Sequence, residues 1–271
     1  MLFAAAMIVY PFAYALVLSL QDFVYGKPAH FVGLGNYVRL FADPLVRNAF
    51  VLTIELWLVS LGLQLVIGTW LGLLLARTQR GRGLARTVLV SPFMLPPVVV
   101  GMMAIVMLDP SFGIANWLLA SIGIGPRQFL ADPDTVIFTV AAIDTWQWAP
   151  FVALIVLGGY LSLPGELFEA AAIDGASGWP RFRHVTLPLL APSIVTAAVL
   201  RSVDLLRFFD IIYITTNGGP GYASTTLNIL AFRRGFEFFD MGYATAMMVA
   251  LAAVVFGTTL AFARVRRAVR W

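Results

Sequence analysis

The sequence contains no cysteine, only two histidines and a single lysine. The absence of cysteine excludes a disulfide framework, thiolate catalysis and a Cys-ligated metal site. With only His30 and His184 available, a centre built from several histidines is not expected either. Function must therefore depend on carboxylates, arginines, aromatic rings and backbone geometry, and we expect no bound metal.

Charged residues are also scarce, since they make up 12% of the chain, whereas 60% of the residues are hydrophobic. Soluble domains are nearer a quarter charged, and a mean hydropathy of +0.87 is too high for a soluble chain of this length. A pI near 9.7 would indicate nucleic acid in a soluble protein. Here the basic residues lie mainly at predicted membrane edges, so we expect a lipid membrane and no nucleic acid as partner.

Six stretches are apolar enough to cross a bilayer, which takes about 20 residues. They are residues 1–20, 48–76, 87–108, 135–160, 189–215 and 241–263. The first lacks a basic segment and a cleavage pattern before Gln21, so we expect a retained helix and not a signal peptide. The sequence thus predicts an all-α, polytopic membrane protein with six transmembrane helices. Residues 1–47 form the first helix and outer loop, and residues 48–271 form the transmembrane core.

The basic residues are distributed unequally between the two sides of the membrane. Ten lie on one side: Arg77, Arg80, Arg82, Arg86, Arg181, Arg183, Arg264, Arg266, Arg267 and Arg270. Six lie on the other, over longer loops: Lys27, Arg39, Arg47, Arg127, Arg233 and Arg234. Because cytoplasmic loops carry the excess of arginine and lysine, both termini and the loop 161–188 are predicted to be cytoplasmic.

The loop 161–188 has the residues of two short helices joined by a corner. Pro164 suits the first turn of a helix, and Glu169 lies near that helix's positive end. Gly175 can take the positive φ that ends a helix, and Ser177 can cap the next one. Leu187-Pro188 then opens the fifth span. On these grounds alone, the loop is either an ordinary amphipathic surface segment or a docking site for another protein.

The residues Glu169-Ala170-Ala171, Asp174-Gly175-Ala176 and Leu187-Pro188, placed between the fourth and fifth spans, resemble the cytoplasmic loop of ABC-importer permeases. In that family the loop forms a coupling helix that docks on the ATP-hydrolysing subunit. The resemblance implies the type I ABC importer permease architecture. It also implies a contact or corner role for Glu169, Ala170, Ala171, Asp174, Gly175 and Ala176.

A second resemblance narrows the family to carbohydrate importers. The segments that carry it are Phe209–Tyr213, Thr216–Pro220, Thr225–Leu227, Trp146–Pro150 and Phe31–Tyr37. They are similar to segments of permeases from maltose, trehalose and glycerol-3-phosphate systems. The resemblance implies a sugar or polyol substrate and a place in the bacterial cytoplasmic membrane. The implied partners are a homologous second permease, two copies of an ABC ATPase and an extracytoplasmic solute-binding protein.

Several ionisable residues fall within the predicted spans, where each costs about 3 kcal/mol unless it is paired or hydrated. In the fifth span Arg201, Asp204, Arg207 and Asp210 recur every third residue, so each can pair with the next. One interpretation is a hydrated substrate pathway formed by Asp144, Trp146, Gln147, Arg201, Asp204 and Arg207. The other is an Arg/Asp ladder that only fixes helix packing. The outer end of this span is assigned a structural role through Asp210, Gly218, Gly219 and Pro220.

The sequence contains no Gly-rich phosphate loop ending in Lys-Ser or Lys-Thr, since its one lysine is Lys27 in a predicted outer loop. We therefore expect a transport subunit that is not an enzyme and binds no cofactor, with ATP used by the partner ATPase. The alternatives are an ABC permease for another solute, such as an amino acid or glycerol-3-phosphate, or an ion-coupled secondary transporter. A membrane-embedded enzyme using Glu55 or Asp144 is a further alternative, with no nucleophile beside it.

Overall fold

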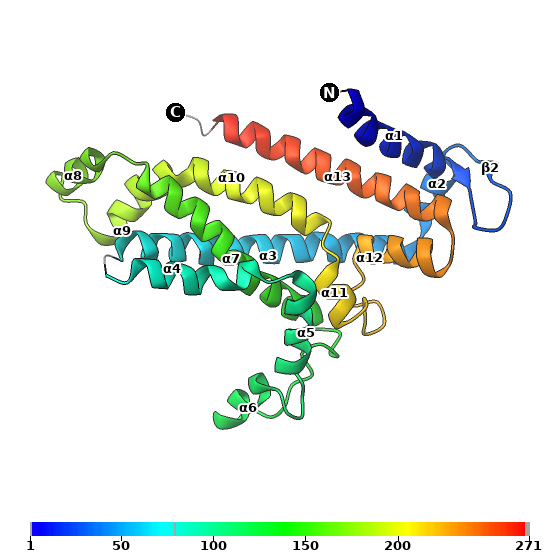
Figure 1. Ribbon diagram of the computed structural model, residues 1–271. Coiled ribbons are helices and arrows are strands. Elements are labelled where there is room, and N and C mark those ends of the chain that lie inside the picture. The colour runs from blue at the N-terminus through cyan, green and yellow to red at the C-terminus, as the bar shows by residue number, and fades with distance from the viewer. Residues whose placement is uncertain (1, 79, 269–271) are drawn as a thin grey trace. The chain divides into compact units, whose positions relative to one another are not determined.

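The computed structural model describes residues 2–78 and 80–268 (Figure 1). Met1, Arg270 and Trp271, which the sequence places in the first span and the tail, lie outside the described residues. Side-chain burial is not described for residues 2–6, 8, 82 and 266–268. Nearly all elements are helices, which confirms the all-α prediction.

The chain runs through a series of helices and one short two-stranded ribbon. In order, they are α1 (Leu2–Ser19), β1 (Gln21–Asp22), β2 (His30–Phe31), α2 (Gly35–Ala42), α3 (Pro44–Arg77), α4 (Arg82–Val90), η1 (Ser91–Met94), α5 (Pro97–Met107), α6 (Ile114–Ser121), α7 (Val136–Leu161), α8 (Gly165–Ile173), α9 (Gly178–Arg181), η2 (Phe182–Thr186), α10 (Leu187–Leu206), α11 (Asp210–Thr215), α12 (Leu227–Phe232), η3 (Arg233–Glu237) and α13 (Met241–Ala268). The boundary predicted between residues 47 and 48 lies within α3.

Four described helices are long and apolar enough to cross a membrane. They are Pro44–Arg77, Val136–Leu161, Gly178–Leu206 and Met241–Val265. A fifth span results if Gly83–Met94 and Pro97–Met107, separated by a short break, are taken together. In the first helix the apolar stretch Val9–Ser19 is shorter than a full span. The multi-pass prediction is confirmed, and the count of six stays a prediction.

The fifth predicted span differs from the helix that forms. Residues 189–215 were expected to be one helix, but α10 ends at Leu206 and α11 starts at Asp210. A carboxylate is favoured in the first turn of a helix, which explains the new start. At the other end the helix begins earlier than expected, at Gly178. The π-turn η2, in which the Leu187 amide bonds to the Phe182 carbonyl, precedes Pro188 and lets the helix pass through it.

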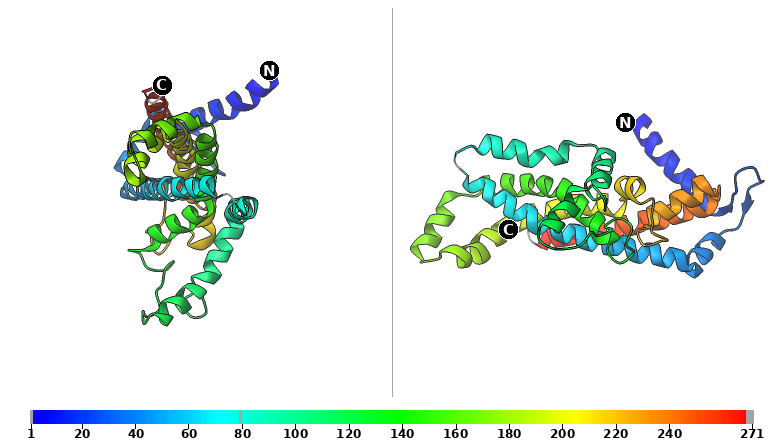
Figure 2. Two further views of the ribbon diagram at one scale, coloured as in Figure 1. Left: turned by 90° about the vertical axis from the view of Figure 1, so that its left-hand side faces the viewer. Right: turned by 90° about the horizontal axis from the view of Figure 1, so that it is seen from below.

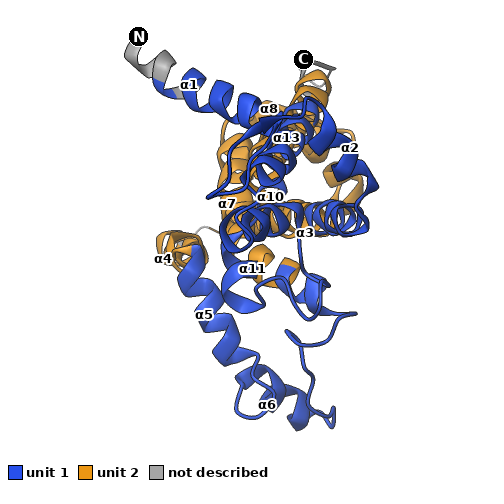
Figure 3. Ribbon diagram, turned by 90° about the vertical axis from the view of Figure 1, so that its right-hand side faces the viewer, with its two compact units in different colours: residues 1–57, 97–140, 206–257 blue, residues 58–96, 141–205, 258–271 orange. Residues whose placement is uncertain are grey.

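The chain divides into two compact units, which are coloured separately in Figure 3. Unit 1 contains residues 1–57, 97–140 and 206–257, and unit 2 contains residues 58–96, 141–205 and 258–271.

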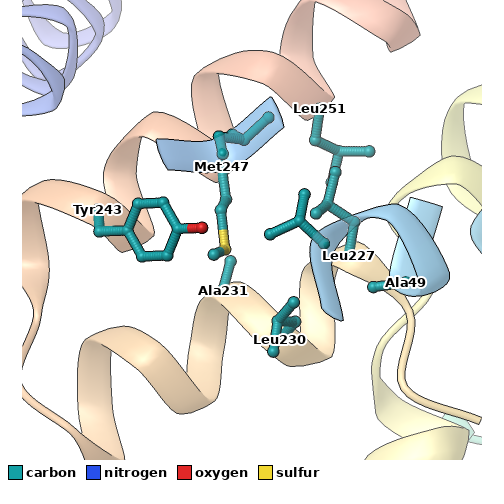
Figure 4. Close-up of a cluster of buried hydrophobic side chains, with 9 residues drawn as sticks. Ala49, Leu227, Leu230, Ala231, Tyr243, Met247 and Leu251 are labelled. Atoms are coloured by element: carbon teal, nitrogen blue, oxygen red, sulfur yellow. The ribbon is translucent and has the colours of Figure 1, made fainter. Parts of the chain in front are cut away.

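In unit 1 a buried core is formed by residues of α2, α3, α12 and α13. Figure 4 shows Tyr243, Met247 and Leu251 of α13 facing Leu227 and Leu230 of α12. All five side chains are buried. The start of α12 is also tied to α3, because the Leu227 amide donates to Thr53 Oγ1 at 2.9 Å. These contacts join segments that are far apart in the sequence.

The motif Phe31–Tyr37 has a structural explanation in unit 1. The buried Asn36 side chain donates through Nδ2 to the carbonyls of Ser19 at 2.9 Å and Gln21 at 2.8 Å. These bonds fix the end of α1 against α2. Gly242 of α13 packs so closely on the Gln21 carbonyl that an added Cβ would collide with it. The motif thus anchors the first helix.

In unit 2 the helices α3, α7 and α10 pack through glycines. A Cβ at Gly68 would lie 2.5 Å from Val152 Cβ, and one at Gly72 would lie 2.7 Å from the Ala153 carbonyl. This is a small-xxx-small contact of the kind that lets membrane helices approach closely. Further along α7, a Cβ at Gly159 would collide with Ser193 of α10.

Candidate functional site

The segment between α7 and α10 forms a short helix, a glycine corner and a second helix (Figures 1 and 2). At the end of α8 the Ala176 amide bonds to the Ala171 carbonyl at 2.9 Å, and the Gly175 amide bonds to the Ala172 carbonyl at 3.1 Å. This pair of bonds is the Schellman motif. Gly175 has φ +76°, so the positive φ predicted for it is confirmed.

Most of the residues expected to contact an ATPase are accessible in unit 2. Glu169, Ala170, Asp174 and Gly175 are exposed, and Ala176 is half-buried. Ala171 differs, because only 7% of it is exposed. Its side chain packs into the unit. The contact roles of these residues stay predictions.

An exposed apolar side chain, which the sequence reading missed, stands beside the acidic residues. Ile173 is 87% exposed at the end of α8, next to Asp174. The second helix adds Trp179, which is 60% exposed and packs on Phe182 with ring centroids 5.1 Å apart. Phe182 in turn stacks on Trp70 of α3 at 5.2 Å. The surface therefore combines carboxylates with apolar groups and is braced against the membrane helices.

The second helix of the segment is continuous with the fifth span. Ser177 occupies the N-cap position of α9 as predicted, although its side chain makes no capping hydrogen bond. From Gly178 the helix runs through α9, η2 and α10 to Leu206. The expectation that Leu187-Pro188 starts a separate helix is wrong. A displacement of the surface segment is therefore transmitted directly to α10.

A buried ion pair lies inside unit 2, between α3, α7 and α10. Arg201 Nη2 donates to Asp144 Oδ2 at 3.0 Å and to Oδ1 at 3.3 Å. The two side chains are 1% and 0% exposed. Gln64 of α3 bridges them, because it accepts from Arg201 Nε at 2.7 Å and donates through Nε2 to Asp144. All three helices thus contribute one polar side chain to a dry cluster.

Aromatic rings complete the surroundings of Arg201. Its guanidinium lies 4.2 Å from the ring centroid of Trp148, one turn beyond Asp144 on α7. Trp148 packs edge-on against Phe93 of η1 at 5.2 Å. Gln147 Nε2 donates to the Leu95 carbonyl at 2.8 Å, which fixes the same segment to α7. Arg201 therefore has its partners inside the unit.

The cluster supports the helix-packing interpretation of the charged ladder. Asp204 is the next rung, with Arg201 Nη1 3.5 Å from its carboxylate, and it is 48% exposed. The ladder does not continue along one helix, because Arg207 follows the end of α10 and Asp210 starts α11. Trp146 is 50% exposed and is not part of the cluster. The expected pathway residues are thus not brought together as one set.

In unit 1, residues 216–226 form a turn held by side chains. Thr216 and Ser224 hydroxyls are 2.7 Å apart, and the Ser224 hydroxyl donates to the Gly219 carbonyl at 2.6 Å. Gly218 has φ +83°, and the Gly219-Pro220 peptide is cis. The predicted turn is confirmed, and Asp210 is exposed at the start of α11.

Two features of unit 2 were missed in the sequence. Gln64 is an uncharged residue in an apolar run, and nothing in the spacing pairs it with Asp144 or Arg201. Gly68 and Gly72 did carry a signal, because Gly-x-x-x-Gly in an apolar helix is a known packing motif. Among the described residues, no group of three or more His, Asp and Glu side chains is arranged to hold a metal ion.

Comparison with known proteins gives a consistent result. Residues 64–271 match the family described as "Binding-protein-dependent transport system inner membrane component". The trehalose/maltose transport system permease protein MalF of Thermococcus litoralis is 36% identical over 245 residues, covering 90% of this chain and 82% of that protein. The sn-glycerol-3-phosphate transport system permease protein UgpA of Agrobacterium fabrum is 32% identical, covering 92% and 86%.

A solved structure shares the fold. One chain of a bacterial ABC transporter involved in the import of the acidic polysaccharide alginate superposes with a TM-score of 0.86 at 23% identity. The match covers 100% of this chain and 93% of that chain.

Proposed function

The chain belongs to the family of binding-protein-dependent transport system inner membrane components, and we propose that it is the permease subunit of an ABC importer for a sugar or polyol. The similarity to a trehalose/maltose permease over nine-tenths of the chain is the observation that carries this proposal. Carbohydrate import is driven by ATP hydrolysis on a separate subunit. The chain itself has no Walker-type phosphate loop.

The coupling surface is the segment from Glu169 to His184. Its exposed carboxylates, the apolar Ile173 and the glycine corner at Gly175 suit a groove on another protein. ATP-driven closure of the motor subunits moves this segment. Because α9, η2 and α10 are continuous, the movement enters the membrane along α10.

The buried ion pair gives this movement a second consequence. Arg201 on α10 is held by Gln64 on α3 and by Asp144 on α7, so the three helix segments of unit 2 respond as one body. Separating them would leave a charge unpaired in an apolar medium, which costs several kcal/mol. Alternating access therefore moves unit 2 with its packing intact.

The proposed assembly contains a homologous second permease, two copies of an ABC ATPase and an extracytoplasmic solute-binding protein. The chain lies in the bacterial cytoplasmic membrane with both termini in the cytoplasm. The excess of basic residues in the loops 77–86 and 161–188 and in the tail supports this orientation.

Reconstitution of the complete importer tests the proposal. The chain is purified with its ATPase, second permease and solute-binding protein, and the complex is placed in proteoliposomes. Labelled maltose and trehalose should accumulate only with ATP and with the solute-binding protein present. Uptake that follows an ion gradient without ATP, in a preparation free of any ATPase, would identify a secondary transporter instead.

A further inference from the structure

Unit 1 contains a cavity of about 520 Å³ that has no role in the coupling argument. It lies between the first turns of α3, the residues that precede and begin α7, and the turn after α11. All its lining residues belong to unit 1. Ligand pockets in proteins have volumes of about 300–1,000 Å³, so this cavity has room for one or two sugar rings.

The cavity presents hydrogen-bonding groups beside flat apolar ones. Glu55 on α3 and Asp134 before α7 supply carboxylates, and Asn48 supplies an amide. Tyr222 and Phe138 supply aromatic rings that are 46% and 49% exposed. Carboxylates and amides hydrogen-bond with hydroxyl groups, and aromatic faces pack on the C–H face of a sugar ring.

The turn 216–226 holds one wall of the cavity in place. Asn48 Nδ2 donates to the Tyr222 carbonyl at 3.4 Å, and the Thr225 amide donates to the same carbonyl at 3.2 Å. Pro220, in the cis peptide of the turn, lines the cavity beside Tyr222. The Gly218-Gly219-Pro220 motif thus positions an aromatic ring as well as ending the helix.

The charge of the cavity limits what it can hold. It has two carboxylates and no basic side chain in its lining, and in the described part of the chain neither Glu55 nor Asp134 has an ion-pair partner through its carboxylate. An anionic phosphate would meet two like charges in the lining, and Arg233, whose guanidinium lies 6.0 Å from the Tyr222 ring centroid, is already paired with Glu237. A single basic side chain from a protein would balance the charge but fill only a small part of the space. A neutral polyhydroxylated ring satisfies both the polar and the apolar lining.

We propose that this cavity is a binding site for a neutral carbohydrate and that Glu55 and Asp134 select against phosphorylated solutes such as glycerol 3-phosphate. The inference rests on the proposed function. It narrows the substrate from any sugar or polyol, phosphorylated or not, to uncharged sugars and polyols. The site lies in the unit that does not contain the coupling segment.

Binding to the assembled transporter in nanodiscs tests the site directly. Saturation-transfer NMR is recorded with maltose, trehalose and sn-glycerol 3-phosphate as probes, without the solute-binding protein. At least one neutral sugar should bind, and Tyr222→Ala or Glu55→Gln should weaken it about tenfold, the loss expected for one charge-assisted hydrogen bond or ring contact. Asp22→Asn, an exposed carboxylate of unit 1 outside the cavity, is the matched control and should change nothing.

The selectivity ratio separates this role from a structural one. The double variant Glu55→Gln, Asp134→Asn should bind glycerol 3-phosphate better relative to the neutral sugar than the wild type does, which a mere loss of folding would not produce. Failure of both neutral sugars to bind, binding that Tyr222→Ala and Glu55→Gln leave unchanged, or equal binding of the phosphate would each overturn the assignment. Uptake by wild-type proteoliposomes is measured in parallel. Absent uptake would contradict the proposed importer function, whereas normal uptake without sugar binding in the cavity would contradict only the proposed binding site.

Discussion

Removing one partner of the Arg201–Asp144 pair should destabilise the protein more than any single change at its surface. Both side chains are almost fully buried, with exposures of 1% and 0%, so solvent screens the attraction between them very little. Asp144→Leu leaves a buried guanidinium with Gln64, a ring face and the half-exposed carboxylate of Asp204, and Arg201→Met leaves a buried carboxylate. Each is expected to lower the free energy of unfolding by about 3–5 kcal/mol.

The double variant gives the decisive comparison. With both charges replaced by apolar groups of similar size, the desolvation penalty disappears together with the attraction. The double variant should then recover part of the loss seen in the single variants and lie about 1–3 kcal/mol below the wild type, because the buried Gln64 amide loses both of its partners. Asp204→Asn removes the exposed rung of the same ladder and should cost less than about 1 kcal/mol.

Unfolding by sodium dodecyl sulfate in mixed micelles, followed by circular dichroism, measures these differences. Single variants within 1 kcal/mol of the wild type, or a double variant whose loss equals the sum of the singles, would refute the reasoning. Uptake by the double variant distinguishes the two interpretations of the charges. Retained uptake means that the pair serves packing, and lost uptake in a stable protein means that it contacts the substrate.

Two glycines give further predictions with matched controls. Gly72→Leu should separate α3 from α7 and lower the free energy of unfolding by about 2–4 kcal/mol, whereas Gly62→Leu on the same helix, where an added Cβ meets nothing within 4 Å, should be nearly neutral in the same assay. Gly175→Val forces a β-branched residue into a positive φ, which costs about 1–3 kcal/mol of strain. It should reduce ATP-driven uptake at least tenfold, while the amount of protein in the membrane stays unchanged. The control Gly165→Val is also in open space but has no positive φ, and it should leave uptake near normal. Equal behaviour within either pair would contradict the packing or the corner assigned to it.

The parts of the fold that follow from local chemistry could be predicted from the sequence. The apolar runs locate the long helices, and Gly175 was identified as the end of α8 because only a positive φ suits that corner. The break after Leu206 could not be predicted, because Arg207 and Asp210 keep the three-residue spacing of a continuous helix. The spacing predicts which residues can meet on one helix, but it does not predict where the helix ends.

The buried cluster of Gln64, Asp144 and Arg201 shows more clearly which contacts the sequence could not predict. Asp144 and Arg201 were recognised as costly charges, but their neighbours on their own helices were the only partners that sequence spacing could offer. Arg201 does reach Asp204 on its own helix, as the spacing allowed, but its buried partner Asp144 lies on another helix. Gln64, the bridge between them, is 80 residues from Asp144 and 137 from Arg201. Such contacts depend on how α3, α7 and α10 pack, which one sequence does not specify residue by residue.

We propose that a separate ATPase drives this chain through the segment from Glu169 to His184. Because the chain has no native cysteine, single introduced cysteines can test this contact directly. Ala170→Cys places a thiol on the exposed face of α8. Ala171 is only 7% exposed, so Ala171→Cys places a thiol on the adjacent buried face. Each is treated with benzophenone maleimide in the assembled importer and illuminated. The account predicts that Ala170→Cys crosslinks to the ATP-hydrolysing subunit and blocks ATP-driven uptake, while Ala171→Cys does neither. If the label at residue 170 forms no crosslink to the ATPase in a preparation that imports sugar with ATP, the proposed coupling contact is wrong.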